Sequence, residues 1–232
     1  MNPLLVIESL SKRFSIHQFE KTITGCHDVS FHVDPGAFVG ITGRSGSGKS
    51  TILKLVYRTY LPERGAIWYE SEADGSINLS EADERAILRL RRREIGYVSQ
   101  FLQVIPRTTA REIVQRAALE SGRNSAEAAA VANEMLTHFE LDESLRDSYP
   151  NTFSGGEKLR LNLAQAMVRR PRLLLLDEPT ASLDAHSKAR VRELIERLKS
   201  EGTTMLGIFH DIEFMGGLCD HEYAMEAGRF IA

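Results

Sequence analysis

The chain has 232 residues, of which 42% are hydrophobic and 26% are charged, and its formal net charge at pH 7 is -3. This composition is typical of an ordinary soluble protein, and the small negative charge disfavours nucleic acid as a partner. All-aliphatic runs such as Leu173 to Leu176 are far shorter than the roughly 20 apolar residues that a membrane-spanning helix needs.

Neither the start of the chain nor its cysteines indicate secretion. The first residues have too short an apolar run for a secretory signal, and they lack a small-residue cleavage site. Cys26 and Cys219 do not have the spacing of metal ligands. We therefore expect a cytoplasmic protein with free, buried thiols and no direct insertion into a membrane.

The first third of the chain begins with a strand and a helix. Residues 36–43, "GAFVGITG", form a short apolar run that predicts a buried strand, and a helix begins near Ile52. Residues 69–83 are polar and rich in turn formers, so we expect a surface loop there. The basic run at residues 89–94 is interpreted as a solvated helix face rather than a nucleic-acid patch, because glutamates flank it.

The middle of the chain is predicted to be helical. Residues 80–94, residues 124–141 and the segment after Ser154 all have helical patterns. This alanine-rich block, at about residues 100–168, interrupts an α/β pattern. We interpret it as a helical subdomain inserted into one core.

The last third of the chain predicts a βαβ unit. Apolar runs at residues 172–179 and 203–209 are typical of buried parallel strands. Asp184 is placed to cap the start of the intervening helix, and Gly202 is placed to end it. A strand, a helix and a strand in this order imply a parallel sheet covered by helices. The apolar face of the helix consists of Val191, Leu194, Ile195 and Leu198.

A phosphate-binding loop is predicted at Gly43 to Thr51, "GRSGSGKST", between the first strand and the first helix. Its glycines let backbone N–H groups converge on phosphate oxygens at the N-terminus of a helix, where the helix dipole favours negative charge. Lys49 would neutralise the β- and γ-phosphates, and the Ser50 hydroxyl would bind Mg²⁺.

The sequence "LLLLDE" supplies acidic residues for the same site. A carboxylate at the carboxyl end of a buried strand stands beside a phosphate loop, so Asp177 is a candidate Mg²⁺ ligand. Glu178 follows it and could orient the attacking water. In isolation, such residues could also be simple helix caps, but the pairing with a phosphate loop favours the nucleotide site.

The sequence "SGGE" predicts a second anion site. Ser154 is placed as the N-cap of the following helix, and Gly155 and Gly156 leave the N–H groups of its first turn accessible. Only one Asp-Glu pair follows a buried strand, however. Two phosphate-contacting loops with one such pair suggest that another copy of the chain completes each site.

Taken together, these motifs closely resemble the nucleotide-binding domain of ABC ATPases, over nearly the whole chain. The phosphate loop at residues 43–51 is similar to the Walker A motif of that family. The further matches are Gln100 in "YVSQF" to the Q-loop, "FSGGE" to the signature motif, "LLLLDEP" to Walker B, "SLD" to the D-loop, and His210 in "GIFHD" to the switch histidine.

The resemblance implies an α/β P-loop NTPase fold of the ABC ATPase type, with a mostly parallel core sheet, an N-terminal antiparallel β subdomain and an inserted helical subdomain. It implies one domain over residues 1–232, in which residues 1–99 and 169–232 form the α/β core with the β subdomain, and about 100–168 form the helical subdomain with the signature. The implied cofactors are ATP and Mg²⁺. Two such domains pack head to tail in this family, so we expect a homodimer or pairing with a related ABC subunit.

The resemblance also implies roles for single residues. Phe14 matches the aromatic residue that stacks on adenine, with a hydrophobic residue at a hairpin edge as the alternative. Asp184 matches the D-loop aspartate that communicates across the dimer, and Glu157 stands where many members have glutamine. The implied catalytic residues are Lys49, Gln100, Glu178 and His210; the ATP-binding residues are Phe14, Gly43, Ser45, Gly46, Ser47, Gly48, Lys49, Ser50 and Thr51, with Ser154, Gly155, Gly156 and Asp184 from the partner; the Mg²⁺ ligands are Ser50, Gln100 and Asp177.

Two stretches outside the shared motifs resemble one subgroup of the family. Residues 98–114 and 50–69 are similar to an ABC-type ATPase subunit of the bacterial carbon-phosphorus lyase system for phosphonate catabolism. This likeness implies association with the lyase core complex, in the step that forms alpha-D-ribose 1-methylphosphonate 5-triphosphate from ATP and methylphosphonate. The main alternative is an ABC transporter of the lipoprotein-release or macrolide-export type. DNA-repair ATPases are disfavoured, because the helical insertion is too short for a long coiled coil.

Overall fold

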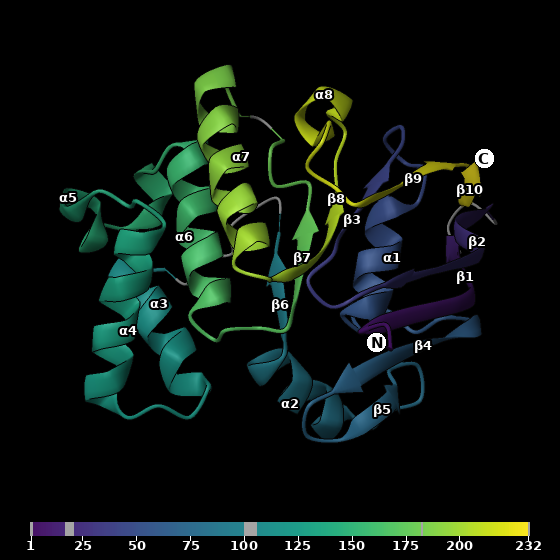
Figure 1. The fold of residues 1–232 in the computed structure, drawn as a ribbon, viewed down its shortest axis with the longest axis horizontal. Helices are drawn as coiled ribbons and strands as arrows, with labels where there is room; N and C mark the ends of the chain where they lie inside the picture. Colours follow the sequence, from purple (N-terminus) through teal and green to yellow (C-terminus); the bar gives the residue numbers. More distant parts are fainter. Residues whose placement is uncertain (1, 17–20, 100–105, 182, 232) are drawn as a thin grey trace.

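The computed structural model describes residues 2–16, 21–99, 106–181 and 183–231. These residues form two sheets and a group of helices (Figure 1). The strands are β1 (Leu5–Ile16), β2 (Lys21–Val33), β3 (Phe38–Thr42), β4 (Arg64–Ser71), β5 (Gly75–Asn78), β6 (Ile95–Val98), β7 (Leu173–Asp177), β8 (Thr204–Ile208), β9 (His221–Glu226) and β10 (Arg229–Ile231). The helices are α1 (Lys49–Val56), α2 (Glu84–Arg93), α3 (Ala110–Glu120), α4 (Ser125–His138), α5 (Glu143–Arg146), the 3₁₀ helix η2 (Pro150–Thr152), α6 (Gly155–Met167), α7 (Ala185–Ser200) and α8 (Ile212–Met215).

The core sheet is mostly parallel and has the strand order β10-β9-β3-β8-β7-β6. Strand β3 pairs in parallel with β8 and β9, and β7 pairs in parallel with β8 and β6. Every residue of β3, β7 and β8 is buried, which explains their uniformly apolar sequences. The three predicted strands and the mostly parallel core are thereby confirmed.

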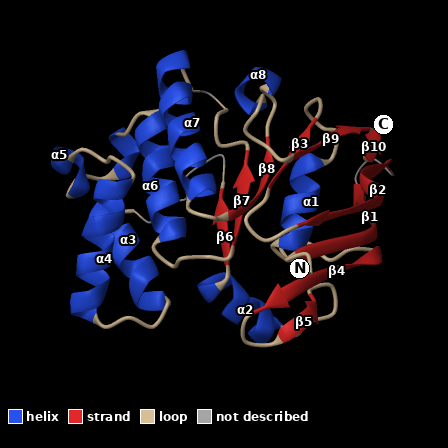
Figure 2. Ribbon diagram, viewed as in Figure 1, coloured by secondary structure: helices blue, strands red, loops and turns tan. Residues whose placement is uncertain are grey.

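The second sheet is antiparallel, with the order β2-β1-β4-β5, and it lies beside α1 (Figure 2). The prediction of a surface loop at residues 69–83 was wrong, because part of this segment forms the hairpin of β4 and β5. Side chains of β4 alternate between buried and exposed positions, and Tyr69 is completely buried. The polar residues that suggested a loop include those on the exposed face of this hairpin and those in its turn.

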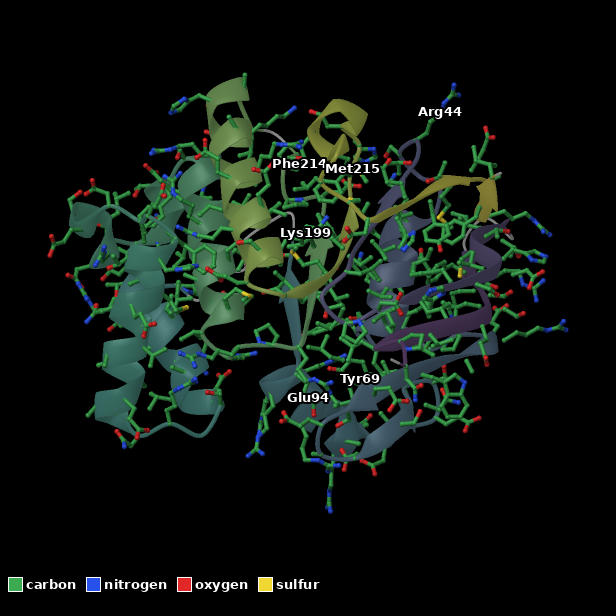
Figure 3. All side chains as sticks on the ribbon, in the orientation of Figure 1. Arg44, Tyr69, Glu94, Lys199, Phe214 and Met215 are labelled. Carbon is green, nitrogen blue, oxygen red and sulfur yellow. The ribbon has the colours of Figure 1, made fainter. Side chains whose placement is uncertain are left out.

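A buried carboxylate holds the β4–β5 turn against the core. Glu94 accepts hydrogen bonds from the Ser71 hydroxyl at 2.8 Å and from the Glu72 amide at 3.1 Å. Glu94 and Tyr69 are neighbours in the lower half of the molecule in Figure 3. No local sequence pattern indicates this contact, because it joins residues that are far apart in the chain.

Helices α6 and α7 begin at the capping residues that the sequence predicts. Ser154 caps α6 and Asp184 caps α7, each accepting a hydrogen bond from a backbone N–H of the first turn, as predicted. Helix α7 ends at Ser200, and Gly202 follows with a φ of 82°, which agrees with its predicted role. Helix α3 was not predicted by itself, although Thr109 and Glu112 form a capping box at its start.

The two cysteines are free thiols, as expected. Cys26 is buried, and Cys219 is half-buried. Burial raises the pKa of Cys26 to about 11 and that of Cys219 to about 12. Both side chains are therefore protonated and poorly reactive at neutral pH.

In the part of the chain that the structure describes, no helix combines the length and the apolar character that crossing a membrane requires.

Candidate nucleotide-binding site

The loop between β3 and α1 has the backbone conformation of a phosphate cradle. Gly43, Gly46 and Gly48 have φ angles of 145°, 78° and 107°, all in the region that favours glycine. A Cβ atom on Gly48 would lie 1.8 Å from the carbonyl oxygen of Gly25 in β2. The loop therefore packs directly against the antiparallel sheet, and only glycine fits at this position. Arg44 projects from the loop into solvent (Figure 3).

Lys49 lies beneath the loop as a buried cation. Its side chain is 3% exposed, and its Nζ donates hydrogen bonds to the carbonyl oxygens of Gly43 at 2.7 Å and Arg44 at 3.0 Å. Burial lowers the pKa of Lys49, and the nearby carboxylates of Glu178 and Asp177 partly oppose this effect. A desolvated ammonium group surrounded by loop carbonyls fits an anionic ligand, which would supply the opposite charge.

Two hard oxygen ligands meet where β7 ends. The Ser50 hydroxyl donates to Asp177 Oδ1 at 2.9 Å, across 127 residues of sequence. Mg²⁺ in phosphate sites usually takes one or two carboxylates together with phosphate oxygens and waters. Ser50 and Asp177 therefore fit a Mg²⁺ ion that also binds a polyphosphate.

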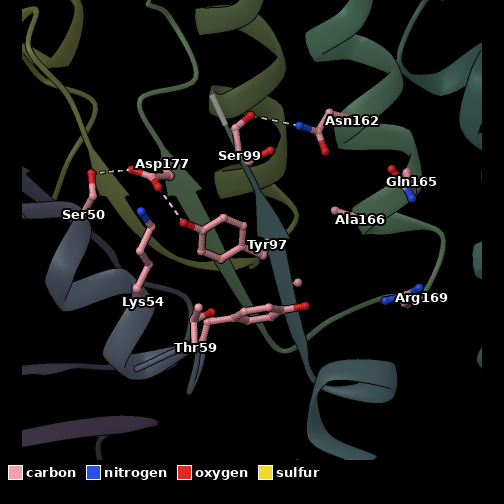
Figure 4. A pocket seen from close by; sticks show the side chains of 12 residues that line it. Ser50, Lys54, Thr59, Tyr97, Ser99, Asn162, Gln165, Ala166, Arg169 and Asp177 are labelled. Carbon is pink, nitrogen blue, oxygen red and sulfur yellow. Dashed lines mark hydrogen bonds between the residues drawn. The ribbon is translucent and has the colours of Figure 1, made fainter. Parts of the chain in front are cut away.

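Asp177 has a second partner that the sequence did not suggest. The Tyr97 hydroxyl in β6 donates to Asp177 Oδ2 at 2.5 Å (Figure 4). Ser50, Tyr97 and Asp177 line a cavity of about 700 Å³, which α6 closes on its other side with Asn162 and Gln165. Tyr97 begins the "YVSQF" stretch, but the Q-loop match gives it no role, and the parallel pairing of β6 with β7 is what brings it to Asp177.

Glu178 and His210 come together from the ends of two neighbouring strands. His210 Nε2 lies 2.6 Å from Glu178 Oε1. The φ of Glu178 is 52°, an uncommon value for a residue other than glycine, and its amide donates to Ile208 O at 3.1 Å. The Glu178 side chain is 17% exposed and that of His210 is 39% exposed. The Glu178 carboxylate is thus held near the buried Lys49 ammonium group, where it could orient a water molecule.

Phe14 lies close to the start of α1. A Cβ atom on Gly25 would be 2.8 Å both from the Phe14 ring and from the Thr51 side chain, so the ring and Thr51 are neighbours. The Phe14 ring packs edge-on against Tyr60, with 5.1 Å between ring centroids. Phe14 is also a hairpin residue, paired with Ile23. Both interpretations of the sequence are compatible with this position.

The residues of "SGGE" form a capping box at the start of α6. The Ser154 amide donates to Glu157 Oε2 at 2.7 Å, and the Glu157 amide donates to Ser154 Oγ at 3.3 Å. Ser154 and Gly155 are exposed, whereas Gly156 is buried against the first turn of α7. Asp184 caps that turn through the Ser187 amide at 2.7 Å, and this bond lowers the pKa of Asp184.

The structure thus divides the predicted site residues into two groups. Phe14, the loop from Gly43 to Thr51, Asp177, Glu178 and His210 surround the start of α1, whereas Ser154, Gly155, Gly156 and Asp184 lie at the starts of α6 and α7. In Figure 1, β7 and β8 lie between α1 and α6. Gln100 lies outside the described residues.

The fold and the site together define a P-loop nucleotide-binding protein. The model of a family described as "ABC transporter" matches residues 26–181. The chain therefore belongs to this family of ATP-binding domains, which bind ATP, typically with Mg²⁺, and hydrolyse it.

Curated relatives have several biological roles. The L-cystine transport system ATP-binding protein TcyN of Escherichia coli K12 is 33% identical over 210 residues, which are 90% of this chain and 83% of TcyN. The cell division ATP-binding protein FtsE of Streptococcus pneumoniae D39 is 31% identical over 96% of this chain and 94% of FtsE. The macrolide export ATP-binding/permease protein MacB of Brucella abortus is 35% identical over 90% of this chain, which spans only 31% of the length of MacB.

Solved structures confirm the fold. The dimeric structure of MJ0796, described as a bacterial ABC transporter cassette, has a TM-score of 0.89 and 28% identity, and the match covers 98% of this chain and 97% of the other. A dimeric post-hydrolysis state of MJ0796 with ADP and Pi has a TM-score of 0.88 and 27% identity, with the same coverage. The α/β fold of the ABC ATPase type is thus confirmed.

The packing of the loop predicts unequal effects of two glycine substitutions. Gly48→Ala forces a Cβ atom onto the Gly25 carbonyl and should lower the free energy of unfolding by about 2–5 kcal/mol. Gly46→Ala has open space around its Cβ, so it should cost only the conformational strain, about 1–2 kcal/mol. Urea unfolding of both variants measures the difference, and equal losses would contradict the packing described here.

Proposed function

We propose that this chain is an ATP-binding and ATP-hydrolysing subunit that works as a head-to-tail dimer, either with a second copy or with a related ABC subunit. Each ATP would lie between the Gly43–Thr51 loop of one chain and residues 154–156 of the other. The observation that carries this proposal is that the two phosphate-contacting segments, at the starts of α1 and α6, are separated within one chain. In Figure 1, β7 and β8 lie between these two helices. The dimeric structures of MJ0796 support it.

In this proposal, residues 1–99 and 169–232 form the α/β core with its β subdomain, and about 100–168 form the helical subdomain that carries the signature. The helices of the second part pack together, since α3 and α4 contact each other and both contact α6. Asp184 would lie at the interface while also capping α7. A nucleotide held from both sides would hold the two chains together.

The residues around the loop would bind and orient the nucleotide. Phe14 would pack on the adenine, the loop amides and Lys49 would bind the phosphates, and Ser50 with Asp177 would hold Mg²⁺, to which Gln100 would also contribute. When bound, Mg²⁺ neutralises charge on the phosphate oxygens.

Glu178 would orient the water that attacks the γ-phosphorus, and the reaction would yield ADP and phosphate. His210, 2.6 Å from Glu178, would fix this carboxylate and reach the γ-phosphate. Catalysis then consists mainly of placing the water and stabilising charge on the transferred group.

For the biological setting, we propose a subunit of the carbon-phosphorus lyase system, which associates with the lyase core complex. The resemblance of residues 98–114 and 50–69 to that subgroup supports this assignment, and it rests on the sequence alone. The chain would then hydrolyse ATP as a subunit of the enzyme system that joins methylphosphonate to the ribose of ATP.

A second candidate is the ATP-binding subunit of a transporter. The relatives MacB and TcyN, which are named as macrolide export and L-cystine transport proteins, favour this setting. A permease would then take the place of the lyase core complex as the partner. Both candidates require the same nucleotide site and the same dimer.

The dimer proposal predicts that Glu178→Gln traps two chains around ATP. The amide keeps the size of the side chain but weakens its hold on water, so hydrolysis should fall at least about 100-fold, in line with the usual contribution of such groups. Size-exclusion chromatography with light scattering should then show a dimer in MgATP and a monomer without nucleotide. The double variant Lys49→Ala/Glu178→Gln is the control and should stay monomeric. A Glu178→Gln chain that remains monomeric in MgATP would contradict the dimer.

The contribution of the second chain is tested separately with Ser154→Arg. The arginine would extend into the position of the neighbour's γ-phosphate, so an excess of this variant should reduce the trapped dimer formed by Glu178→Gln chains. Ser125→Arg is a matched control, because Ser125 is also an exposed serine at the start of a helix, α4. Equal trapping with both arginine variants would show that the site is complete within one chain.

The two biological settings differ in what binds the chain. A tagged chain, recovered from its host grown with a phosphonate as the sole phosphorus source, should copurify with soluble lyase subunits identified by mass spectrometry. Copurification with a polytopic permease from the membrane fraction would move the assignment to a transporter. In either case the dimer experiments keep their meaning, because they use the purified chain.

A further inference from the structure

The carboxylate of Asp177 is held at both of its oxygens. Oδ1 accepts from the Ser50 hydroxyl at 2.9 Å, and Oδ2 accepts from the Tyr97 hydroxyl at 2.5 Å. The Asp177 residue is 9% exposed, so these two donors replace most of the water that a free carboxylate would bind. Ser50 and Asp177 are the residues that fit Mg²⁺, whereas Tyr97 comes from the neighbouring strand β6 and approaches the carboxylate from the side opposite Ser50 (Figure 4).

Tyr97 is rigidly placed. It lies in β6, whose register with β7 pairs Tyr97 with Leu175, two residues before Asp177. Its ring packs against Tyr57, with 4.8 Å between ring centroids. The Arg91 guanidinium lies 4.4 Å from the centre of the Tyr57 ring and donates to the Tyr57 carbonyl oxygen at 2.6 and 2.9 Å. The hydroxyl therefore has a fixed position from which to donate.

The Tyr97 hydroxyl is a neutral group, and it donates its hydrogen to Asp177 Oδ2. A neutral donor of this kind constrains the carboxylate without adding a positive charge that would compete with a metal ion.

We propose that Tyr97 is a positioning residue of the metal site: its hydroxyl holds Asp177 Oδ2, so that Oδ1 stays beside the Ser50 hydroxyl and the two oxygens form a preset pair for Mg²⁺. This inference rests on the proposed function. It assigns a role to Tyr97, the first residue of the "YVSQF" stretch, in which the Q-loop match gives a role only to Gln100.

The Tyr97 hydroxyl prevents the Asp177 carboxylate from turning toward Lys49. These two groups are near enough for the carboxylate to raise the pKa of Lys49. Without the hydroxyl, Oδ2 would lose its donor while remaining largely buried, and the carboxylate would gain by turning toward the ammonium group of Lys49. Such a turn would separate Oδ1 from the Ser50 hydroxyl and so break up the pair of oxygens that fits Mg²⁺.

The test is Tyr97→Phe, which removes only the hydroxyl and keeps the ring that packs on Tyr57. Mn²⁺ serves as the probe for the metal, and its binding to the chain with ATP is followed by electron paramagnetic resonance. We expect the Mn²⁺ concentration at half-saturation to rise about 10–100-fold, the usual effect of removing a hydrogen bond to a metal ligand. The affinity for a fluorescent ATP analogue in EDTA should change less than about twofold, since orientation of the metal pair matters only with metal present.

Tyr57→Phe is the matched control. Tyr57 lines the same cavity and loses the same group, but the Tyr97 hydrogen bond to Asp177 stays in place. This variant should bind Mn²⁺ and nucleotide as the unmodified chain does, and both variants should keep its melting temperature within a few degrees.

Three results would overturn the inference while leaving the proposed function intact: unchanged Mn²⁺ binding in Tyr97→Phe, equal weakening in the two phenylalanine variants, or equal loss of nucleotide binding in EDTA and in Mn²⁺. The first would show that Asp177 needs no such anchor, and the others would indicate a general effect on packing. Failure of the unmodified chain to bind ATP with Mn²⁺ would instead contradict the proposed function itself.

Discussion

The parallel register of β3, β8, β7 and β6 is the constraint on which the site depends. Asp177 pairs with Ile208, and Ile208 pairs with Ile41, so three strands end at the same level of the sheet. The phosphate loop follows β3, Glu178 follows β7 and the His210 segment follows β8. A shift of one residue in any strand would turn its side chains to the opposite face and separate the acidic residues from the loop.

The second phosphate-contacting segment, residues 154–156, depends instead on how helix α6 begins. It offers the backbone N–H groups and the Ser154 hydroxyl at the start of α6, and the capping box of Ser154 and Glu157 holds this first turn in place. This bond gives a physical role to Glu157, where many ABC ATPases have glutamine: its carboxylate accepts from the Ser154 amide at 2.7 Å. A charged acceptor also suits the positive end of the helix dipole. The departure from the family pattern thus strengthens the helix start beside Ser154.

Much of the core sheet and of the phosphate loop could be predicted from the sequence, because local residue patterns determine these parts. The strands at β3, β7 and β8, the caps of α6 and α7, and the glycine loop each depend on residues within a short window. The hairpin of β4 and β5 could not be found in this way, since its burial depends on Glu94 and on pairing with β1. Tyr97 was missed for a similar reason: it reaches Asp177 only through the pairing of β6 with β7. The place of Phe14 beside Thr51 likewise required the packing of the antiparallel sheet on α1.

The central claim is that one nucleotide is held by two chains. The most direct measurement is a crystal structure of the Glu178→Gln chain with MgATP, in which the distances from each γ-phosphate to the nearest lysine Nζ and serine Oγ are determined. We predict that Lys49 Nζ of one chain and Ser154 Oγ of the other both lie within hydrogen-bonding distance of the same γ-phosphate. A γ-phosphate contacted by Lys49 alone, with both copies of Ser154 open to solvent, would contradict it.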